Sequence, residues 1–364
     1  VLSPEIFLPA SVIIAAIISL ATGSSWTTSA TVGIALVGIG SALGIPTGMI
    51  AGAVISGGYF GDKMSPLSDT TNLAPAMAGT DLFTHIKYMM YTTIPTILIT
   101  LIVFIILSGT VDTSGTADIR SLLTSIDSAF NITPLLFIVP VAVIGMILFK
   151  TKPLIALVIG VILAAVFAFI FQDNVLASLA SSNLEAITTA ILTDVEVKTD
   201  NTQLTELFNA GGMKGMIWTI LLIICAMVFG GIMDAIGALA KITKKLLSIA
   251  TSVFGLFAST VVSCLGLNIV ASDQYLSLVI PGKMFKKAYE DKGLAPENLS
   301  RTLEDSGTVT SVLIPWNTCG AYQAGVLGVG VGEYAAYAIF NYLSPFVTLL
   351  FAAFSIKIRQ TIKK

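Results

Sequence analysis

The sequence predicts an all-α polytopic membrane protein that contains inverted repeats with discontinuous helices or re-entrant hairpins. Of its 364 residues, 55% are hydrophobic and 11% are charged, whereas soluble domains contain about 25% charged residues. Long apolar runs alternate with short polar segments, as in proteins that cross a bilayer several times. Some polar segments also interrupt apolar sequence. These three observations exclude a soluble globular protein.

Apolar runs predict the membrane helices in chain order. They lie at Ile6–Ala21, Gly33–Leu43, Pro46–Tyr59, Tyr88–Leu107, Thr133–Phe149, Pro153–Phe171, Gly212–Ala240, Leu246–Leu265 and Ala335–Ile356. The segments between them are predicted as polar or charged loops at Gly109–Ile132, Gln172–Gly211 and Lys283–Arg301. Polar breaks are predicted at Thr22–Ser25 and at Gly266–Asn268, and the second precedes a shorter segment at Ile269–Pro281.

The stretch Ser56–Pro95 lies between apolar segments and yet is polar and interrupted by Pro66 and Pro75. It holds Asp62, Lys63, Asp69, Asn72, Asp81, His85 and Lys87. A charged group at membrane depth costs about 2.5–3.5 kcal/mol, and irregular backbone there must be buried in protein or line a water-filled cavity. The stretch is therefore predicted to build a substrate or ion site. The lone histidine, His85, is predicted at the membrane interface.

The charge pattern fixes a predicted orientation. The basic segments expected in the cytoplasm are Lys150/Lys152, Lys241–Lys245, Lys283–Arg301 and the tail Lys357–Lys364. The loops Gly109–Ile132 and Gln172–Gly211 are then outside. Basic residues form no continuous face, which excludes nucleic-acid binding and leaves the lipid bilayer as the surrounding partner. Cys225, Cys264 and Cys319 are interpreted as small buried hydrophobic residues, without a disulfide or zinc site.

The chain is predicted to contain two copies of one unit. The division is a first inverted repeat at 1–108, a connector with two transmembrane helices and outward polar loops at 109–211, and a second inverted repeat at 212–364. The paired segments are Gly44–Pro46 with Leu294–Pro296, Ser56–Gly57 with Ser306–Gly307, and Ser68–Thr70 with Trp316–Thr318. One copy ends outside and the other inside, as in secondary transporters with inverted repeats. The first copy lacks an equivalent of Gly212–Ala240, which predicts a missing N-terminal part.

Oxygen-bearing side chains near the breaks are the predicted ligands of a hard cation such as Na⁺. In the two copies these are Ser24, Ser25, Thr27, Asp69, Thr70 and Asn72, and then Asn268, Ser272, Asp273, Asn317 and Thr318. The predicted Na⁺ positions are at Asp69, Asp273, Asn268 and Asn317. Asp69 is the leading proton carrier and Asp273 the second, with a helix N-cap as the structural alternative for Asp69.

Three further acidic residues are predicted as proton carriers or gates. Asp62 is interpreted as a gate or as the structural ion-pair partner of Lys63. Glu304 and Asp305 either carry protons or cap a segment that begins at Ser306.

Three strings carry a family resemblance. They are ATGSSWTTSATVGIA from Ala21, GYFGDKMSPLSDTTNLAPAMAGTDLFTHI from Gly58 and LSRTLEDSGTVTSVLIPWNTCGAY from Leu299. The chain resembles the NhaC-type sodium/proton antiporter family, over nearly its whole length. The resemblance implies a scaffold plus a moving transport domain, a homodimer, Na⁺ and H⁺ as transported ions without a cofactor, and a multi-pass place in a prokaryotic cell membrane. Some relatives exchange sodium-coupled malate for lactate.

The leading functional hypothesis is Na⁺/H⁺ exchange by alternating access, and the alternative is coupled exchange of a carboxylate such as malate or lactate. Arg120, Arg301 and Arg359 all fall in predicted loops or the tail, so no guanidinium clamp for a dicarboxylate is expected. Helix N-termini at the breaks remain an alternative way to hold an anion. An enzyme is disfavoured because nucleophile-elbow and HExxH motifs are absent. A passive channel would need a continuous pore.

Overall fold

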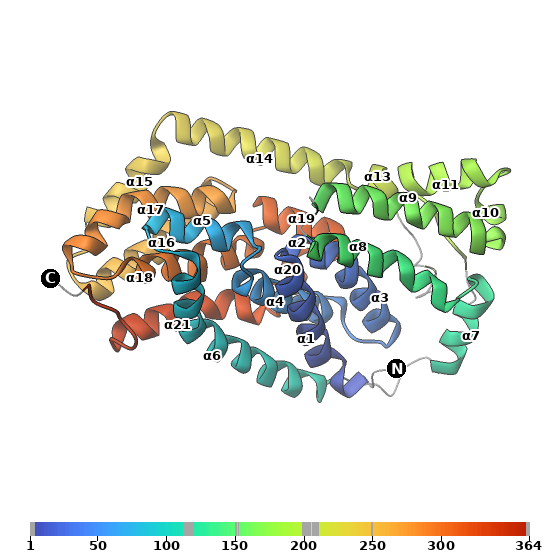
Figure 1. The fold of residues 1–364 in the computed structure, drawn as a ribbon, viewed down its shortest axis with the longest axis horizontal. Helices are drawn as coiled ribbons and strands as arrows, with labels where there is room; N and C mark the ends of the chain where they lie inside the picture. The colour runs from blue at the N-terminus through green and yellow to red at the C-terminus, as the bar shows by residue number, and fades with distance from the viewer. Residues whose placement is uncertain are drawn as a thin grey trace. The chain divides into compact units, whose positions relative to one another are not determined.

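The structure is a computed structural model that describes residues 4–111, 119–149, 151, 153–198, 205, 211–248 and 250–361. No β-strand forms among these residues, and the predicted all-α polytopic class is confirmed. The predicted basic turn at Lys150 and Lys152 and the end of the basic tail at 362–364 lie outside the described residues. Contacts divide the chain into two compact units (Figure 1). The larger comprises Val1–Ile34, Thr47–Thr110 and Leu221–Lys364, and the smaller comprises Ala35–Pro46 and Val111–Ile220.

The helices of the larger unit come from both ends of the sequence. They are α1 (Pro4–Thr22), α2 (Ser25–Thr28), η1 (Ser29–Gly33), α4 (Thr47–Met64), α5 (Asp69–Ala78), α6 (Leu82–Ser108), most of α14 (Ile217–Ala235), α15 (Ala238–Ser248), α16 (Val253–Val270), α17 (Gln274–Asp291), α18 (Pro296–Leu303), η3 (Glu304–Thr308), η4 (Ser311–Leu313), α19 (Thr318–Leu327), α20 (Val331–Tyr334) and α21 (Ile339–Ala353). The smaller unit holds nearly all of α3 (Ile34–Ala42), with α7 (Ile119–Ala129), η2 (Pro134–Phe137), α8 (Ile138–Leu148), α9 (Pro153–Phe171), α10 (Asp173–Leu179), α11 (Asn183–Leu192) and α13 (Gly212–Gly215).

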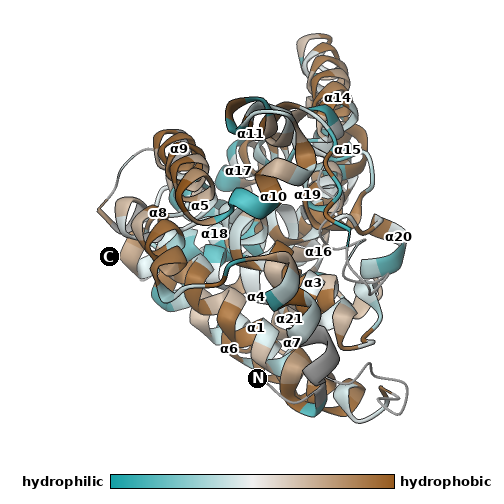
Figure 2. Cartoon of the chain, turned by 90° about the vertical axis from the view of Figure 1, so that its right-hand side faces the viewer, coloured by the Kyte–Doolittle hydropathy of each residue, from teal (hydrophilic) through white to brown (hydrophobic). Residues whose placement is uncertain are grey.

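Among the described residues, four single helices are long and apolar enough to cross a membrane. They are Glu5–Thr22, Leu82–Ser108, Ile217–Ala235 and Val253–Val270. A fifth candidate is the pair Ile155–Phe171 and Asp173–Leu179, which bends by 100° at its break. Hydrophobic residues run along α9 and α14, where lipid contact favours them (Figure 2).

Three of the predicted spans contain helices shorter than expected, and the longest of these helices is the 15-residue α21 within Ala335–Ile356. The helix within Gly33–Leu43 has nine residues and the main helix within Thr133–Phe149 has eleven. A helix that crosses the hydrocarbon core alone needs about 20 residues, so none of these helices meets that length by itself.

Three segments predicted as loops contain helices instead. Gly109–Ile132 contains α7, Gln172–Gly211 contains α10 and α11, and Lys283–Arg301 contains the end of α17 and most of α18. The polar composition of these segments predicts loops, although two of them also contain residues that start helices. Ser182 accepts a hydrogen bond from Glu185 N at the start of α11, and Pro296 occupies the first turn of α18.

The predicted break at Gly266–Asn268 is wrong in position. Helix α16 continues to Val270, and the backbone turns at Ser272, which has φ +58°. A single glycine within an apolar run does not end a helix, because it costs only about 1 kcal/mol relative to alanine.

Small residues let α4 approach α1 closely. A Cβ atom at Gly57 would fall against the Val12 carbonyl oxygen, and one at Gly61 would meet the backbone of Ala16 and Leu20. Glycine at such positions allows helix backbones to pack by van der Waals contact where lipid supplies no hydrophobic driving force. Helix α4 is thereby held against α1, with α6 and α21 on its other sides.

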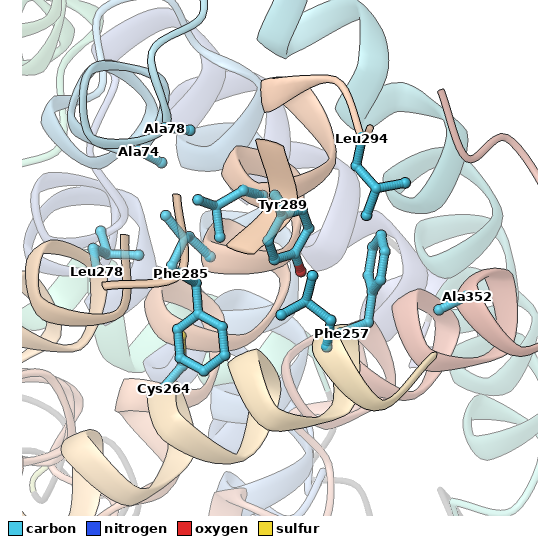
Figure 3. Close-up of a cluster of buried hydrophobic side chains, with 12 residues drawn as sticks. Ala74, Ala78, Phe257, Cys264, Leu278, Phe285, Tyr289, Leu294 and Ala352 are labelled. Atoms are coloured by element: carbon cyan, nitrogen blue, oxygen red, sulfur yellow. The ribbon is translucent and has the colours of Figure 1, made fainter. Parts of the chain in front are cut away.

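An apolar cluster is formed mainly by buried side chains of α16 and α17 (Figure 3). Phe257 and Cys264 of α16 face Phe285 and Tyr289 of α17, and residues of α5 and α21 complete the cluster. The Tyr289 hydroxyl shares a hydrogen bond with Thr260 at 3.2 Å. Of the three cysteines, Cys264 and Cys319 are buried as expected, whereas Cys225 is exposed on α14.

We expect Gly57→Ala to destabilise the protein, because its methyl group would overlap the Val12 carbonyl of α1. The overpacking should cost about 1–3 kcal/mol, measured as a lower unfolding temperature of the detergent-purified protein. Gly266→Ala is the matched control, since no atom lies within 4 Å of a Cβ placed there. Equal unfolding temperatures for the two variants would contradict the predicted close approach of α1 and α4.

Candidate functional site

The larger unit has a first half, formed by Val1–Ile34 and Thr47–Thr110, and a second half, Leu221–Lys364. In each half, one helix is followed by a residue in the left-handed conformation and then by an N-cap residue. After α1, Gly23 has φ +70° and the Ser24 side chain accepts a hydrogen bond from Thr27 N at 3.1 Å. After α16, Ser272 has φ +58° and Asp273 accepts from Leu276 N at 3.0 Å. Glycine adopts this conformation freely, whereas Ser272 is strained by its Cβ. The two breaks therefore leave polar backbone and side-chain groups at one point in each half.

Each break packs against the start of a ten-residue helix. Ser68 caps α5, and a Cβ at Gly23 would lie 2.7–2.8 Å from Leu67 Cβ and Ser68 N. Asn317 caps α19, and Thr318 N donates to Ser272 O at 2.9 Å. Helix N-termini carry partial positive charge, so negative or polar groups gather there favourably.

The amide side chains of Asn268 and Asn317 meet at the second break. Asn317 Nδ2 donates to Asn268 O at 3.0 Å and to Asn268 Oδ1 at 3.3 Å. Asn268 Nδ2 donates to Gly307 O at 2.7 Å and to Thr310 Oγ1 at 3.0 Å. Asn317 Oδ1 accepts from Cys319 N at 3.0 Å. Both amide oxygens thus accept hydrogen bonds within the protein, which ties α16 to η3 and α19.

Asp62 serves the first break and does not pair with its neighbour Lys63. Its Oδ2 accepts hydrogen bonds from Ser25 N at 3.0 Å and Ser25 Oγ at 2.7 Å. Its Oδ1 is buried and makes no hydrogen bond of ordinary geometry, and the Ser68 side chain also lies near the carboxylate. The interpretation of Asp62 and Lys63 as an ion pair is therefore wrong, because adjacent helical residues point in different directions.

Asp69 lies in an exposed position at the start of α5, with Ser68 rather than Asp69 as the N-cap. The Tyr275 hydroxyl donates to Asp69 Oδ2, and Thr70 N donates to Asp69 Oδ1 at 2.8 Å. Tyr275 follows Asp273 closely on α17, so the two acidic residues predicted as Na⁺ positions lie at the ends of neighbouring helices. Asn72 is also exposed, and its side chain donates to Ser68 O at 2.6 Å.

A buried ion pair joins the two halves. Lys63 Nζ of α4 contacts Asp305 Oδ1 of η3, and both side chains are fully buried. Thr92 donates to Asp305 Oδ2 at 2.8 Å, Thr348 donates to the same oxygen, and Ser344 lies 3.3 Å from Oδ1. The hydroxyl groups satisfy the remaining lone pairs of the carboxylate, which is what makes a buried pair tolerable.

Glu304, next to Asp305, has fewer partners. It is fully buried and neither carboxylate oxygen makes a hydrogen bond of ordinary geometry, although the Thr308 side chain lies near enough to stabilise its negative charge. Its electrostatic surroundings include Lys63 together with the carboxylates of Asp62 and Asp305. The alternative that Glu304 and Asp305 cap a segment from Ser306 is wrong, since α18 continues without a break into the π-helix η3. π-Helical turns occur frequently at functional sites.

The chain matches known proteins of one family. The model of the Na⁺/H⁺ antiporter family matches residues 57–356. The chain belongs to the Na⁺/H⁺ antiporter family. This confirms the resemblance that the sequence motifs carry, and the family is one of transporters.

Several relatives in the antiporter family are similar to this chain over most of their length. The chain is 41% identical to the Na⁺/H⁺ antiporter NhaC of Alkalihalophilus pseudofirmus, over 96% of this chain and 74% of that protein. It is 38% identical to NhaC of Bacillus subtilis, over 92% and 73%. It is also 37% identical to the malate-2H⁺/Na⁺-lactate antiporter of Bacillus subtilis, over 98% and 73%.

Three charged or titratable side chains that the sequence placed elsewhere are buried in the antiporter fold. Lys63 is paired across the molecule, His85 is fully buried and hydrogen-bonded through Nδ1 to Ser300 at 2.7 Å, and Arg301 is fully buried on α18. The prediction of Arg301 in a loop is wrong, whereas the interfacial depth of His85, in the first turn of α6, stays a prediction. The Lys63–Asp305 contact spans 242 positions, and no local pattern encodes such a pairing.

We expect Lys63→Met to destabilise the protein by about 3–5 kcal/mol, because Asp305 would remain buried and unpaired. The double variant Lys63→Met, Asp305→Asn should recover most of this loss, since it removes both charges. Thermal unfolding of the purified proteins measures both effects. Lys214→Met is the control, because the Lys214–Asp194 pair is exposed and should be worth about 0–1 kcal/mol. A double variant no more stable than Lys63→Met would refute this account of the pair.

Proposed function

We propose that the chain is a secondary transporter of the cell membrane that exchanges Na⁺ for H⁺ by alternating access. The observation that carries this proposal is the Glu304 carboxylate, which is fully buried and has no ion-pair partner among the described residues. We assign Glu304 as the group that binds either a proton or Na⁺.

The assignment follows from the cost of burying charge. An ionised carboxylate in a low-dielectric interior is unstable unless a partner neutralises it. Lys63 does not serve Glu304, because its ammonium group is already paired with Asp305. A proton or a cation must then neutralise Glu304. Since the two ions compete for one carboxylate, binding of Na⁺ releases H⁺, which is the elementary step of antiport.

Asp62 supplies a second carboxylate to the same region. Its Oδ1 is unpaired, and its charge acts on Glu304. Na⁺ prefers several oxygen ligands, so we propose that Asp62 and Glu304 together provide the anionic part of the site. The neutral Lys63–Asp305 pair then fixes α4 against η3 without contributing net charge.

The residues predicted from sequence keep distinct proposed roles. Asp69 is exposed, and we place it with Asp273 on the access path rather than at the exchange step. Coordination of Na⁺ at Asn268 and Asn317 remains a prediction that requires their hydrogen bonds to rearrange. The inverted repeats, the re-entrant character of α5 and α19, the homodimer and the three-part domain division also remain predictions. Support comes from the matching caps and left-handed ends of α5 and α19, at Gly79 and Gly328.

Glu304→Gln tests the proposal in liposomes that contain a pH-sensitive dye and an acidic interior. We expect external Na⁺ to dissipate the gradient with the wild-type protein. Glutamine can neither carry a proton nor neutralise Na⁺, so the variant should be slower by on the order of 100-fold or more.

Glu290→Gln is the matched control, because Glu290 is exposed on α17 and should tolerate the same substitution. Both proteins must first show equal incorporation into the liposomes. Na⁺-driven exchange by Glu304→Gln at the rate of the control would reject Glu304 as the carrier.

A further inference from the structure

Arg301 is a buried cation that the ion-exchange site does not use. It lies on α18 with no exposed surface and is the largest fully buried side chain among the described residues. Its guanidinium carbon lies 4.5 Å from the centre of the Tyr88 ring and 5.9 Å from that of Phe351. Aromatic faces favour a guanidinium through cation–π attraction. They leave the N–H groups at the edge of the plane free to donate hydrogen bonds.

The hydrogen bonds of Arg301 are incomplete in a specific way. Nη1 donates to the Lys357 carbonyl oxygen at 3.4 Å, while Nε and Nη2 have no acceptor among the described residues. Nε and Nη2 form one edge of the guanidinium, and two parallel N–H bonds from such an edge match a carboxylate. Burying this cation without a counter-charge would cost several kcal/mol.

The nearest acidic residues along the helix are engaged elsewhere. Glu297, one turn before Arg301, contacts Arg359 Nη1 at 2.7 Å. Glu304, one turn after it, has Lys63 as the cation of its electrostatic surroundings. Among the described residues no carboxylate forms an ion pair with Arg301. The protein therefore holds a planar cation whose two-donor edge lacks an internal partner.

We propose that Arg301 forms a binding site for a small carboxylate, which accepts two hydrogen bonds from Nε and Nη2. This site is separate from the one proposed for Na⁺ and H⁺, and it does not depend on exchange at Glu304. It reverses the expectation that the chain has no arginine placed to hold an organic acid.

A short C-terminal strap, residues 357–361, lies beside Arg301. Ala295 N donates to Arg359 O at 2.9 Å, and Thr361 N donates to Gly293 O at 2.8 Å. The strap carbonyl of Lys357 accepts from both Tyr88 and Arg301. Ser355 and Lys357 at its base have φ of +53° and +48°, which non-glycine residues rarely adopt. Arg359 also bonds to Tyr88 and Asn298 and pairs with Glu297. The carboxylate would enter when these contacts open together.

Binding can be measured directly on the unmodified chain. Arg120, Arg301 and Arg359 are its three arginines, so ¹⁵N-arginine labelling gives an Nε spectrum in which Arg301 is assignable. L-lactate should shift the Arg301 signal saturably, whereas neutral lactamide at the same ionic strength should not. An Arg301 signal that is unchanged by lactate, and by malate as a dicarboxylate probe, would overturn the site.

Arg301→Lys tests the role of the two-donor edge while keeping the positive charge. In calorimetric titration we expect this variant to bind lactate at least about tenfold more weakly, because lysine cannot donate two parallel hydrogen bonds. Lys214→Arg, an exposed exchange between the same two residue types in the smaller unit, is the control. Undiminished affinity in Arg301→Lys would overturn the assignment. Sodium-driven proton exchange, measured without carboxylate, reports separately on Glu304.

Discussion

The need to neutralise charge inside an apolar protein governs the arrangement of the larger unit. Three buried groups on adjacent turns of α18 and η3 meet this need differently. Asp305 is paired with Lys63 and surrounded by hydroxyl groups, Glu304 has no ion-pair partner among the described residues, and Arg301 is enclosed by aromatic rings with one edge free. A fully paired charge stabilises a fixed structure, whereas an unpaired one is stable only when something else binds. The same helix therefore combines a structural contact with two groups suited to bind ions.

The backbone of this unit makes such burial possible. Left-handed residues at Gly23 and Ser272 end α1 and α16, and capped helix N-termini lie opposite them. The π-helices η1 and η3 lie in the polar part of each half, and their wider turns change the direction of the side chains that follow. Glycine contacts between α4 and α1 hold the first half close to its neighbours. Each of these local features involves only a few residues and is encoded by a short stretch of sequence.

Much of the fold can be predicted from the sequence because lipid imposes a simple length rule on apolar helices. Leu82–Ser108 and Val253–Val270 follow directly from hydropathy, and the antiporter family follows from long motifs. The candidate site is predicted less well. Ser25 and Asp62 are both predicted site residues, but the sequence does not predict the hydrogen bond between them. Lys63 pairs with a residue 242 positions away. Arg301 is predicted in a loop because its segment is charged, whereas the structure places it on α18, where Glu297 pairs with Arg359 of the C-terminal tail.

The central claim is that one buried carboxylate binds either H⁺ or Na⁺, and proton release on Na⁺ binding tests it most directly. NaCl would be added to the purified protein in weakly buffered detergent solution, with choline chloride as the ionic-strength control, and the released protons would be counted. The account predicts that Na⁺ releases protons from the wild-type protein and that Glu304→Gln releases fewer. Na⁺ that binds without proton release, or equal release by both proteins, would contradict it.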